Sequence, residues 1–223
     1  MAESTENKPP RAAQAVTEGA RRVLLDIAAR EFATHGYGGA RLERIAQEAG
    51  ITRAMIYYYF KGREGLYVAV LEDAYDAIWK AEQEIATAGL SPIAALRQLV
   101  EFRVFYYVRH PTFVALVGIE NQEEARHLKR SVTVASSAAP SLDQTARILN
   151  EGKASGAFRP DIDVVDLYQV IVSLAFFNVS NRHTFGEIFG RKNDFDAAHV
   201  CAFVTDVVLR YVSCDPCKTE QGP

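Results

Sequence analysis

The chain has 223 residues, of which 48% are hydrophobic and 24% charged, and this composition is that of a soluble globular protein with a substantial core. The formal net charge of −3 excludes a protein that is basic throughout, although residues 1–66 carry ten Lys and Arg against eight Asp and Glu, while residues 67–223 carry fifteen against twenty. Three cysteines argue against a disulfide framework, and no apolar run reaches the roughly 18 residues of a membrane span, so we expect a cytoplasmic protein without a membrane partner.

The first residues are polar and contain two adjacent prolines. Residues 1–16 are therefore predicted to form a flexible arm. Thr17 is a candidate N-cap, and apolar residues then recur at helical spacing at Leu24, Ile27 and Phe32. The sequence predicts a first helix that ends at the glycine-containing stretch that follows.

A second and a third helix are predicted on either side of a tight turn. Leu42, Ile45 and Ala46 recur at spacings of three and four, which places an apolar stripe on a short helix. Gly50 accepts the left-handed backbone conformation that follows a helix end, and Thr52 can cap a new helix with its hydroxyl. These signals together predict a helix, a turn and another helix.

The third predicted helix, RAMIYYYF at residues 53–60, carries more aromatic side chains than a small domain can bury. Ile56 and Phe60 lie four residues apart and form its core face. Arg53, Ala54 and the three tyrosines that follow Ile56 are left over, unless one of the tyrosines belongs to the core. Exposed aromatic side chains beside an arginine indicate a surface that contacts a partner.

The rest of the chain predicts a series of helices separated by Gly, Pro, Ser and Asp signals. No segment alternates with the period of a strand, so the predicted fold class is all-α. The predicted helices cover residues 63–88, 92–109, 112–118, 141–155, 164–182 and 197–212, with a polar-faced segment at 122–134 and a short helical turn at 184–189. Residues 214–223 are predicted to be a flexible tail.

The last two long helices are apolar on more than one face. In the helix at 164–182, Val170, Ile171, Leu174 and Phe177 do not fit on one buried stripe. A second copy of the chain would cover the remaining apolar face if each copy contributed two helices to a four-helix bundle. The sequence therefore predicts a homodimer formed through helices near residues 164–182 and 197–212.

The sequence offers no catalytic or metal-binding pattern. It has no H-E-x-x-H, G-x-S-x-G or phosphate-loop motif, and its five histidines lack acidic neighbours at catalytic spacing. Cys214 and Cys217 form a CDPC pair without the second pair of ligands that a zinc site needs. We therefore expect neither an enzyme nor a protein that carries a metal or cofactor.

Over residues 18–212 the sequence resembles the TetR family of bacterial transcriptional regulators. The resemblance rests on a first helix that ends with an aromatic residue and a glycine loop, on I-A-x-x-A-G-I-T at residues 45–52, and on Y-x-Y-F followed by basic residues and a leucine at residues 57–66. It implies a helix-turn-helix DNA-binding domain at residues 17–66 and a helical ligand-binding and dimerisation domain at residues 67–213.

The resemblance also implies a homodimer that represses transcription on a palindromic double-stranded DNA operator and is released by a small-molecule effector. Two positions depart from the family pattern. Ala40 stands where a threonine usually caps the second helix and contacts a phosphate, and Tyr59 stands where histidine is common. Arg41 can take over the phosphate contact of the missing threonine.

If the third helix enters a major groove, its first residues face base edges and its flanks face phosphates. Arg53 is the predicted base reader, because a guanidinium can bond guanine O6 and N7 together, and Ala54 and Tyr57 can contact thymine methyl groups. The predicted phosphate contacts are Thr52, Tyr58, Tyr59, Lys61, Arg41, Arg44 and Arg63. An alternative role for Arg44 is a salt bridge with Glu48, four residues further along the helix, and no contact with DNA.

A ligand pocket in the second domain needs an aromatic lining and a few polar groups. The predicted pocket residues are Phe102, Phe105, Tyr106, Phe113, Glu120, Asn121, Phe177, Asn181 and Arg182. The alternative for each aromatic residue is a place in the core, where aromatic residues at helical spacing are more often found. The stretch NRHTF from residue 181 supplies either Arg182 for an acidic group of the ligand or a hydrogen-bond network at the dimer edge.

A different class of function is also compatible with the sequence. The chain can be a helical small-molecule-binding protein or a small enzyme in which the helix-turn-helix is only a scaffold. That class predicts a catalytic constellation, which the sequence lacks.

Overall fold

The computed structural model describes residues 11–190 and 195–214. Within these ranges it is built from helices, with one isolated antiparallel bridge between Phe158 and Ser213, so the all-α prediction is confirmed. The predicted arm up to residue 10 and the predicted tail from residue 215 lie outside the described residues.

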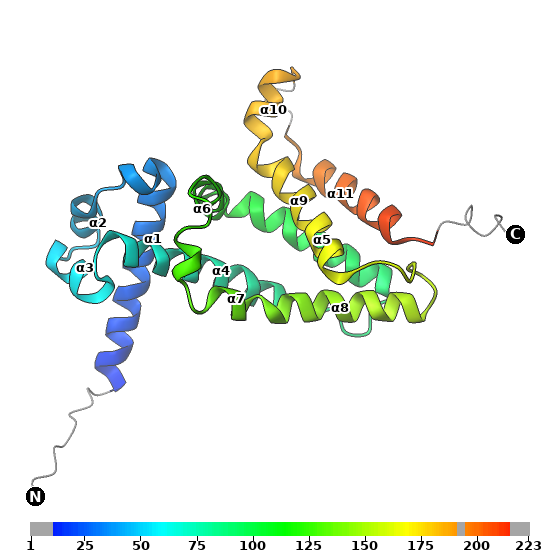
Figure 1. The fold of residues 1–223 in the computed structure, drawn as a ribbon, viewed down its shortest axis with the longest axis horizontal. Coiled ribbons are helices and arrows are strands. Elements are labelled where there is room, and N and C mark those ends of the chain that lie inside the picture. The colour runs from blue at the N-terminus through cyan, green and yellow to red at the C-terminus, as the bar shows by residue number, and fades with distance from the viewer. Residues whose placement is uncertain (1–10, 191–194, 215–223) are drawn as a thin grey trace, which may run out of the picture. The chain divides into compact units, whose positions relative to one another are not determined.

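The helices follow one another along the chain as Figure 1 shows. They are α1 (Arg11–Gly39), α2 (Leu42–Glu48), α3 (Arg53–Phe60), α4 (Arg63–Gln83), α5 (Pro92–Arg109), α6 (Pro111–Gln122), α7 (Val134–Ser137), α8 (Ala139–Ala154), α9 (Val164–Ser180), α10 (Arg182–Ile188) and α11 (Ala197–Val212), and a short 3-10 helix spans Leu128–Arg130.

The described residues pack into two compact units. The first unit contains the residues up to Asp73 together with Ile119–Arg130, and the second contains Ala74–Gly118 and the residues from Ser131. Helices α4 and α6 each pass from one unit into the other. The sequence predicted a boundary near residue 66, and it did not predict that Ile119–Arg130 belongs to the first unit.

Helices α1, α2 and α3 surround the core of the first unit. The predicted apolar stripes are buried, including Phe32, Ile45 and Ile56, none of which is exposed. The turn after α2 forms as predicted, because Gly50 has a φ of 65° and the Ile51 N–H donates to the Ala46 carbonyl at 2.9 Å. Helix α1 is longer than predicted.

The start of α1 at Arg11 corrects the prediction for Thr17. Thr17 lies inside the helix and not at its N-terminus. The preceding segment, RAAQAV, is rich in residues with high helix propensity, so the helix extends toward the N-terminus beyond the expected cap.

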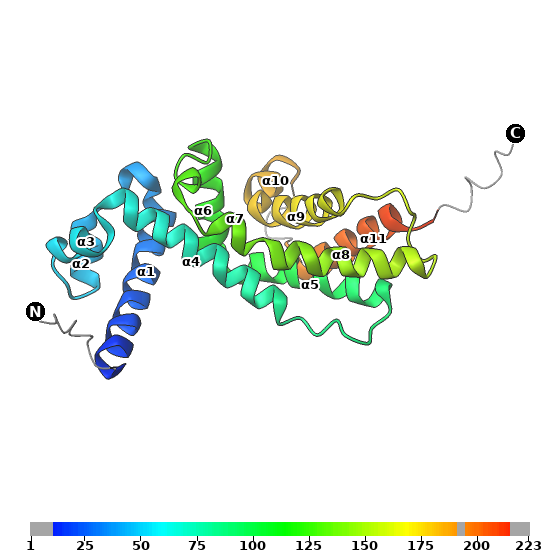
Figure 2. The ribbon, with the colours of Figure 1, turned by 60° about the horizontal axis from the view of Figure 1, so that its bottom comes forward.

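Helix α5 is central in the second unit. It packs against α8, α9 and α11 (Figure 2). Helix α9 in turn packs against both α8 and α11. Its start was predicted correctly, since the Ser91 hydroxyl accepts a hydrogen bond from the Ala94 N–H at 3.3 Å ahead of the first-turn Pro92. The position of α5 places its side chains at the core of the unit.

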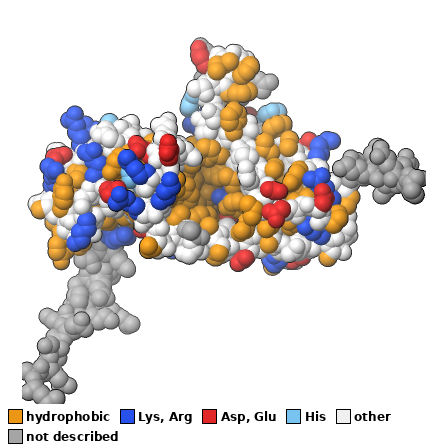
Figure 3. Space-filling view, viewed as in Figure 1, with side chains coloured by type: hydrophobic (Ala, Val, Ile, Leu, Met, Phe, Trp, Pro, Cys, Tyr) orange, Lys and Arg blue, Asp and Glu red, His pale blue; other side chains and the backbone are white. Residues whose placement is uncertain are grey.

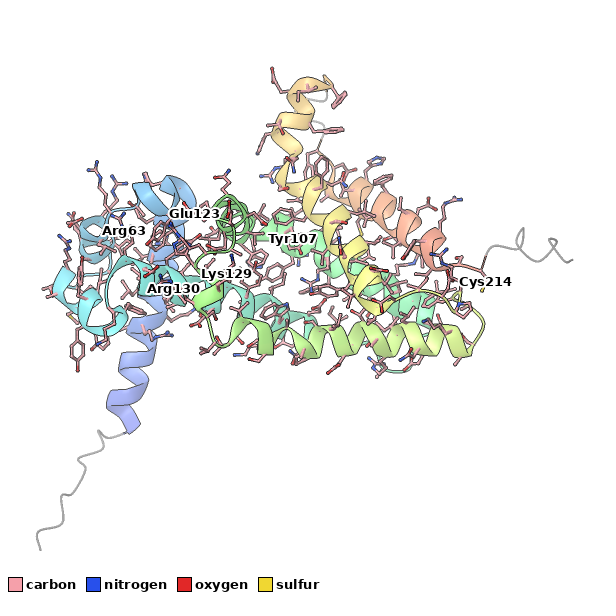
Figure 4. All side chains as sticks on the ribbon, in the orientation of Figure 1. Arg63, Tyr107, Glu123, Lys129, Arg130 and Cys214 are labelled. Carbon is pink, nitrogen blue, oxygen red and sulfur yellow. The ribbon has the colours of Figure 1, made fainter. Side chains whose placement is uncertain are left out.

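A charged cluster is buried beside α5. Arg103 on α5 donates to both carboxylate oxygens of Glu82 on α4, at 3.0 and 2.6 Å, and also to the Tyr168 hydroxyl. Burial opposes the charge of Arg103, but Tyr107 and Glu82 raise the pKa of this guanidinium above its ordinary value, so it stays charged. Figure 4 shows Tyr107 on the same helix.

Several helix boundaries differ from those predicted. Helix α4 ends at Gln83 instead of residue 88, α6 continues to Gln122, and the segment 122–134 contains only the 3-10 turn before α7. The predicted helix at 164–182 is interrupted at Asn181, after which α10 continues at an angle of 64°. Among the described helices no single one is long and apolar enough to span a membrane. Helices α9 and α10 reach that length and apolarity only when they are taken together as this bent pair.

Candidate nucleic-acid interface

Helix α3 presents an unusually apolar and aromatic outer face. Its N-terminus is capped as predicted, since the Thr52 hydroxyl accepts from the Met55 N–H at 3.4 Å, and Ile56 and Phe60 are buried. All three tyrosines are exposed, with 46% of Tyr57, 74% of Tyr58 and 55% of Tyr59 accessible. The alternative that one tyrosine belongs to the core is therefore wrong, because the two core positions of this short helix are already filled.

Arg53 lies at the start of α3 and is held by two neighbours. One terminal nitrogen is 2.7 Å from a carboxylate oxygen of Glu43 on α2, and the other donates to the Tyr57 hydroxyl at 3.1 Å. The hydrogen bond with Tyr57 and then the charge of Glu43 raise the pKa of Arg53. The sequence did not point to Glu43, because this contact joins two helices and has no local spacing signal.

The position of Tyr57 depends on the glycine that follows α3. Gly62 has a φ of 116°, and a β-carbon there would lie 3.3 Å from the Tyr57 ring. The Tyr57 ring in turn faces the Arg53 guanidinium, whose central carbon is 5.4 Å from the ring centroid. Gly62, Tyr57 and Glu43 thus together set the place of the Arg53 side chain.

The missing cap at the start of α2 has a substitute from another helix. Glu31 on α1 is buried, and its carboxylate accepts from the Arg41 N–H at 3.0 Å and from the Arg44 guanidinium at 3.3 Å. Ala40 itself is buried. The loss of the family threonine is therefore offset by a carboxylate that reaches α2 from ten residues upstream.

The alternative pairing of Arg44 with Glu48 is wrong. Arg44 contacts Glu31 and also lies 3.0 Å from the His35 ring nitrogen, whereas Glu48 pairs with Arg30 at 2.7 Å. The contacts to α1 prevail because α2 packs against that helix. About half of the Arg44 side chain remains exposed and available to a partner.

Basic side chains flank α3 on both sides. Lys61 ends the helix in the left-handed conformation with a φ of 64°, and its ammonium donates to the Tyr58 carbonyl at 3.4 Å. Arg63 donates to the Gly38 carbonyl at 3.2 Å, which ties the start of α4 to the end of α1. Lys and Arg side chains gather on this unit in Figure 3, and Figure 4 labels Arg63, Lys129 and Arg130 there.

The predicted pocket residues fall in three separate places. Tyr106 lies between Phe102 and Phe113, with ring centroids 5.4 and 5.9 Å away, and Phe105 instead contacts Arg109. Glu120 and Asn121 lie in the first unit, at the end of α6. The nine predicted residues therefore do not line one common site within either unit.

The third group of predicted pocket residues borders a cavity of about 470 Å³ between α9, α10 and the start of α11. Phe177, Asn181 and Arg182 line it, and so do Phe195, His199 and Phe203 from the other side, which were not predicted from the sequence. The Arg182 guanidinium donates to the Val179 carbonyl at 2.9 Å and lies over the Phe195 ring. The cavity combines four phenylalanine side chains with several polar and charged groups.

Glu120 has a role that the sequence did not predict. Its buried carboxylate accepts from the His127 N–H at 2.8 Å, from the Leu128 N–H at 2.9 Å and from the His127 ring at 2.9 Å. His127 packs against Tyr37 and Tyr67, with ring centroids 4.1 and 4.8 Å away. The prediction that the histidines lack acidic neighbours is therefore wrong for His127. Glu120 and His127 come together only because the chain turns back after α6, which their spacing in the sequence does not show.

Metal-binding clusters and paired cysteines do not emerge from the described residues. No group of three or more His, Cys, Asp or Glu side chains is placed to hold a metal ion in ranges 11–190 and 195–214. Cys214 is exposed and contacts the Gly156 carbonyl at 3.6 Å, and Cys217 lies outside the described residues. The interface on the first unit is the part of the described chain with the features of a nucleic-acid reader.

Comparison with known families supports this interpretation. A family described as "Bacterial regulatory proteins, tetR family" matches residues 24–70, which include α2 and α3. A second, described as "Tetracyclin repressor-like, C-terminal domain", matches residues 92–208.

Individual relatives are transcriptional repressors by name. The chain is 35% identical over 189 residues to the HTH-type transcriptional repressor NicS of Pseudomonas putida, covering 84% of this chain and 89% of that protein. It is 29% identical over 159 residues to the HTH-type transcriptional repressor KstR2 of Mycolicibacterium smegmatis, covering 71% and 77%.

Two solved structures share the fold. The ketosteroid transcriptional regulator KstR2 of Mycobacterium tuberculosis superposes with a TM-score of 0.63 at 22% identity, over 87% of this chain and 95% of that one. FadR of Bacillus subtilis, solved in complex with stearoyl-CoA, superposes with a TM-score of 0.68 at 18% identity, over 84% and 97%.

Proposed function

The chain belongs to the TetR family of bacterial transcriptional regulators, and on that premise we propose that it is a repressor that binds a palindromic operator as a homodimer and leaves it when a small molecule binds. The observation that carries the proposal is the outer face of α3. Arg53 and three exposed tyrosines project from a helix whose core face is fully buried. Such a face has no role inside the unit and suits a DNA groove.

We assign the side chains of this face by their positions on α3. Arg53 at the first turn reads a guanine edge, and Ala54 and Tyr57 contact the neighbouring bases. Thr52, Tyr58, Tyr59 and Lys61 contact phosphates, as do Arg41, Arg44 and Arg63 to the extent that their intramolecular bonds leave donors available. An arginine has five N–H donors, so one bond within the protein does not exhaust it.

The base-reading role of Arg53 is tested by comparison with Lys61. We expect Arg53→Ala to lose about 1 to 3 kcal/mol of discrimination between the operator and a scrambled duplex. We expect Lys61→Ala to weaken binding to both duplexes alike and to reduce the slope of log affinity against log salt by about one. The operator is first selected from a random-sequence duplex library, and binding is then titrated by fluorescence anisotropy at several salt concentrations.

Two outcomes of this titration speak against the assignment. Equal losses on operator and scrambled duplex for Arg53→Ala would show that Arg53 contacts phosphate and not bases. If the unaltered protein selects no sequence and binds no duplex, the proposed function is wrong. In that case the alternative, a small-molecule-binding protein or small enzyme with the helix-turn-helix as scaffold, gains support.

The homodimer is proposed through α9 and α11. Phe177 on α9 and Phe203 on α11 are each about half exposed, at 52% and 48%. Both also line the cavity beside Arg182, so these half-exposed apolar side chains lie near one another and favour contact with another protein surface at the rim of that cavity. Sedimentation equilibrium is expected to give about twice the chain mass of 24.7 kDa, and a monomer mass at micromolar concentration would contradict the proposal.

An effector site is proposed in the second unit. The aromatic group around Tyr106 and the cavity beside Phe177 and Arg182 are the two candidate places. The relatives support an apolar effector only by analogy, since one neighbour is named for ketosteroids and another was solved with stearoyl-CoA. A metabolite that raises the melting temperature and also releases operator DNA would identify the effector.

A further inference from the structure

Glu43 is an acidic side chain on the face that we propose to meet DNA. It lies in the first turn of α2, and 62% of the side chain is exposed. An exposed carboxylate at such a face repels phosphate, so its presence needs a reason. Its contact with Arg53, at 2.7 Å, supplies one.

We propose that Glu43 is a specificity-determining residue, which holds Arg53 for a guanine edge and prevents it from binding phosphates without regard to sequence. The inference rests on the proposed DNA-binding function. It adds a role for a residue that makes no favourable DNA contact of its own.

An arginine on a DNA-binding face has two kinds of target, phosphates and base edges. A phosphate carries a full negative charge, and its attraction for a guanidinium falls when a carboxylate already neutralises that guanidinium. The O6 and N7 atoms of guanine are neutral acceptors, which need well-placed N–H groups more than net charge. A neutral pair of Glu43 and Arg53 therefore loses more affinity for phosphate than for guanine.

The geometry of Arg53 leaves donors for such a base contact. Glu43 contacts one terminal nitrogen, and Tyr57 accepts from the other at 3.1 Å. Three of the five N–H groups remain after these two contacts. Because Gly62 makes room for the Tyr57 ring, Tyr57 holds the guanidinium from a second direction.

The experiment measures binding of Glu43→Gln to a scrambled duplex. Release of Arg53 adds about one phosphate contact, so the slope of log affinity against log salt should steepen by about 0.9, which is about a 3.5-fold larger loss of affinity between 50 and 200 mM salt. The affinity for scrambled DNA at low salt should rise, and the ratio of operator to scrambled affinity should fall.

Glu48→Gln is the matched control. Glu48 lies on the same helix, its pair with Arg30 has the same length of 2.7 Å, and its side chain is 53% exposed. The control changes the net charge by the same amount without releasing Arg53, so it should change the slope less than Glu43→Gln does. The double variant Glu43→Gln with Arg53→Gln should return the slope to that of Arg53→Gln alone.

Any one of three results would overturn the inference: an unchanged slope on scrambled DNA for Glu43→Gln, an equal steepening for Glu48→Gln, or a steepening that persists in the double variant. If the unaltered protein prefers its operator while one of these results is found, the proposed function stands and the role of Glu43 fails. If the unaltered protein binds no DNA, both fail together.

Discussion

Replacement of Arg103 by methionine is expected to lower the free energy of unfolding by about 3 to 5 kcal/mol, because it leaves a buried carboxylate without its partner. Glu82 has no solvent exposure, and each of its carboxylate oxygens accepts a hydrogen bond from Arg103. The Tyr168 hydroxyl, which also bonds Arg103, would lose that partner too. Urea denaturation followed by circular dichroism measures the change.

Two controls distinguish the buried charge from a general loss of packing. The double variant Glu82→Met with Arg103→Met should be more stable than Arg103→Met alone, because no unpaired charge then remains in the core. Asp206→Asn, which breaks an exposed pair with Arg210 on α11, should change stability little. A double variant as unstable as the single one would contradict the explanation.

The order and type of the helices followed from local signals in the sequence. The apolar spacing of α2, the glycine after it and the capping residues Thr52 and Ser91 all act within a few residues of themselves, and each was confirmed. Helix ends were less predictable where propensity continues beyond a cap, as in α1 before Thr17. The break between α9 and α10 was predicted close to its place, at about residue 183, and the structure puts it at Asn181, where the apolar run of α9 ends and a polar stretch begins.

The exposed face of α3 was predictable, but the contacts that position it were not. The residue types and their spacing predict which side chains of α3 point outward. Glu31 at the start of α2 and Glu43 beside Arg53 act between helices, and no spacing along the chain reveals such pairs. The same reason explains why Glu120 was assigned to a ligand pocket when its carboxylate instead bonds His127.

The segment Ile119–Arg130 is the largest feature of the first unit that the sequence did not predict. It carries His127, which is fully buried and packs on Tyr37 and Tyr67. It also pairs with the helix-turn-helix region on the surface, where Arg130 lies 2.9 Å from Glu64. Ile119–Arg130 thus contacts α1 and α4 of the first unit, and we expect it to support that unit, although in the sequence it lies between two parts of the second unit.

Replacement of Glu120 by leucine tests this support. The variant leaves three donors without an acceptor: the buried His127 N–H and ring, and the partly buried Leu128 N–H. Each buried donor left unsatisfied costs about 1 to 3 kcal/mol, so a loss of about 3 kcal/mol or more is expected. The loss should be concentrated in the first unit, because all of these groups belong to it.

Hydrogen exchange resolves where the stability is lost. In Glu120→Leu, the backbone amides of α1, α2 and α3 should exchange faster, while those of α5 and α11 should keep their protection, since units of a protein can open separately. Operator affinity should fall with the same temperature dependence as this local opening. Glu123→Gln, which breaks only the partly exposed pair with Arg126 on the same segment, should leave exchange in α1, α2 and α3 unchanged. Equal exchange in the two variants would mean that Ile119–Arg130 does not support α1, α2 and α3.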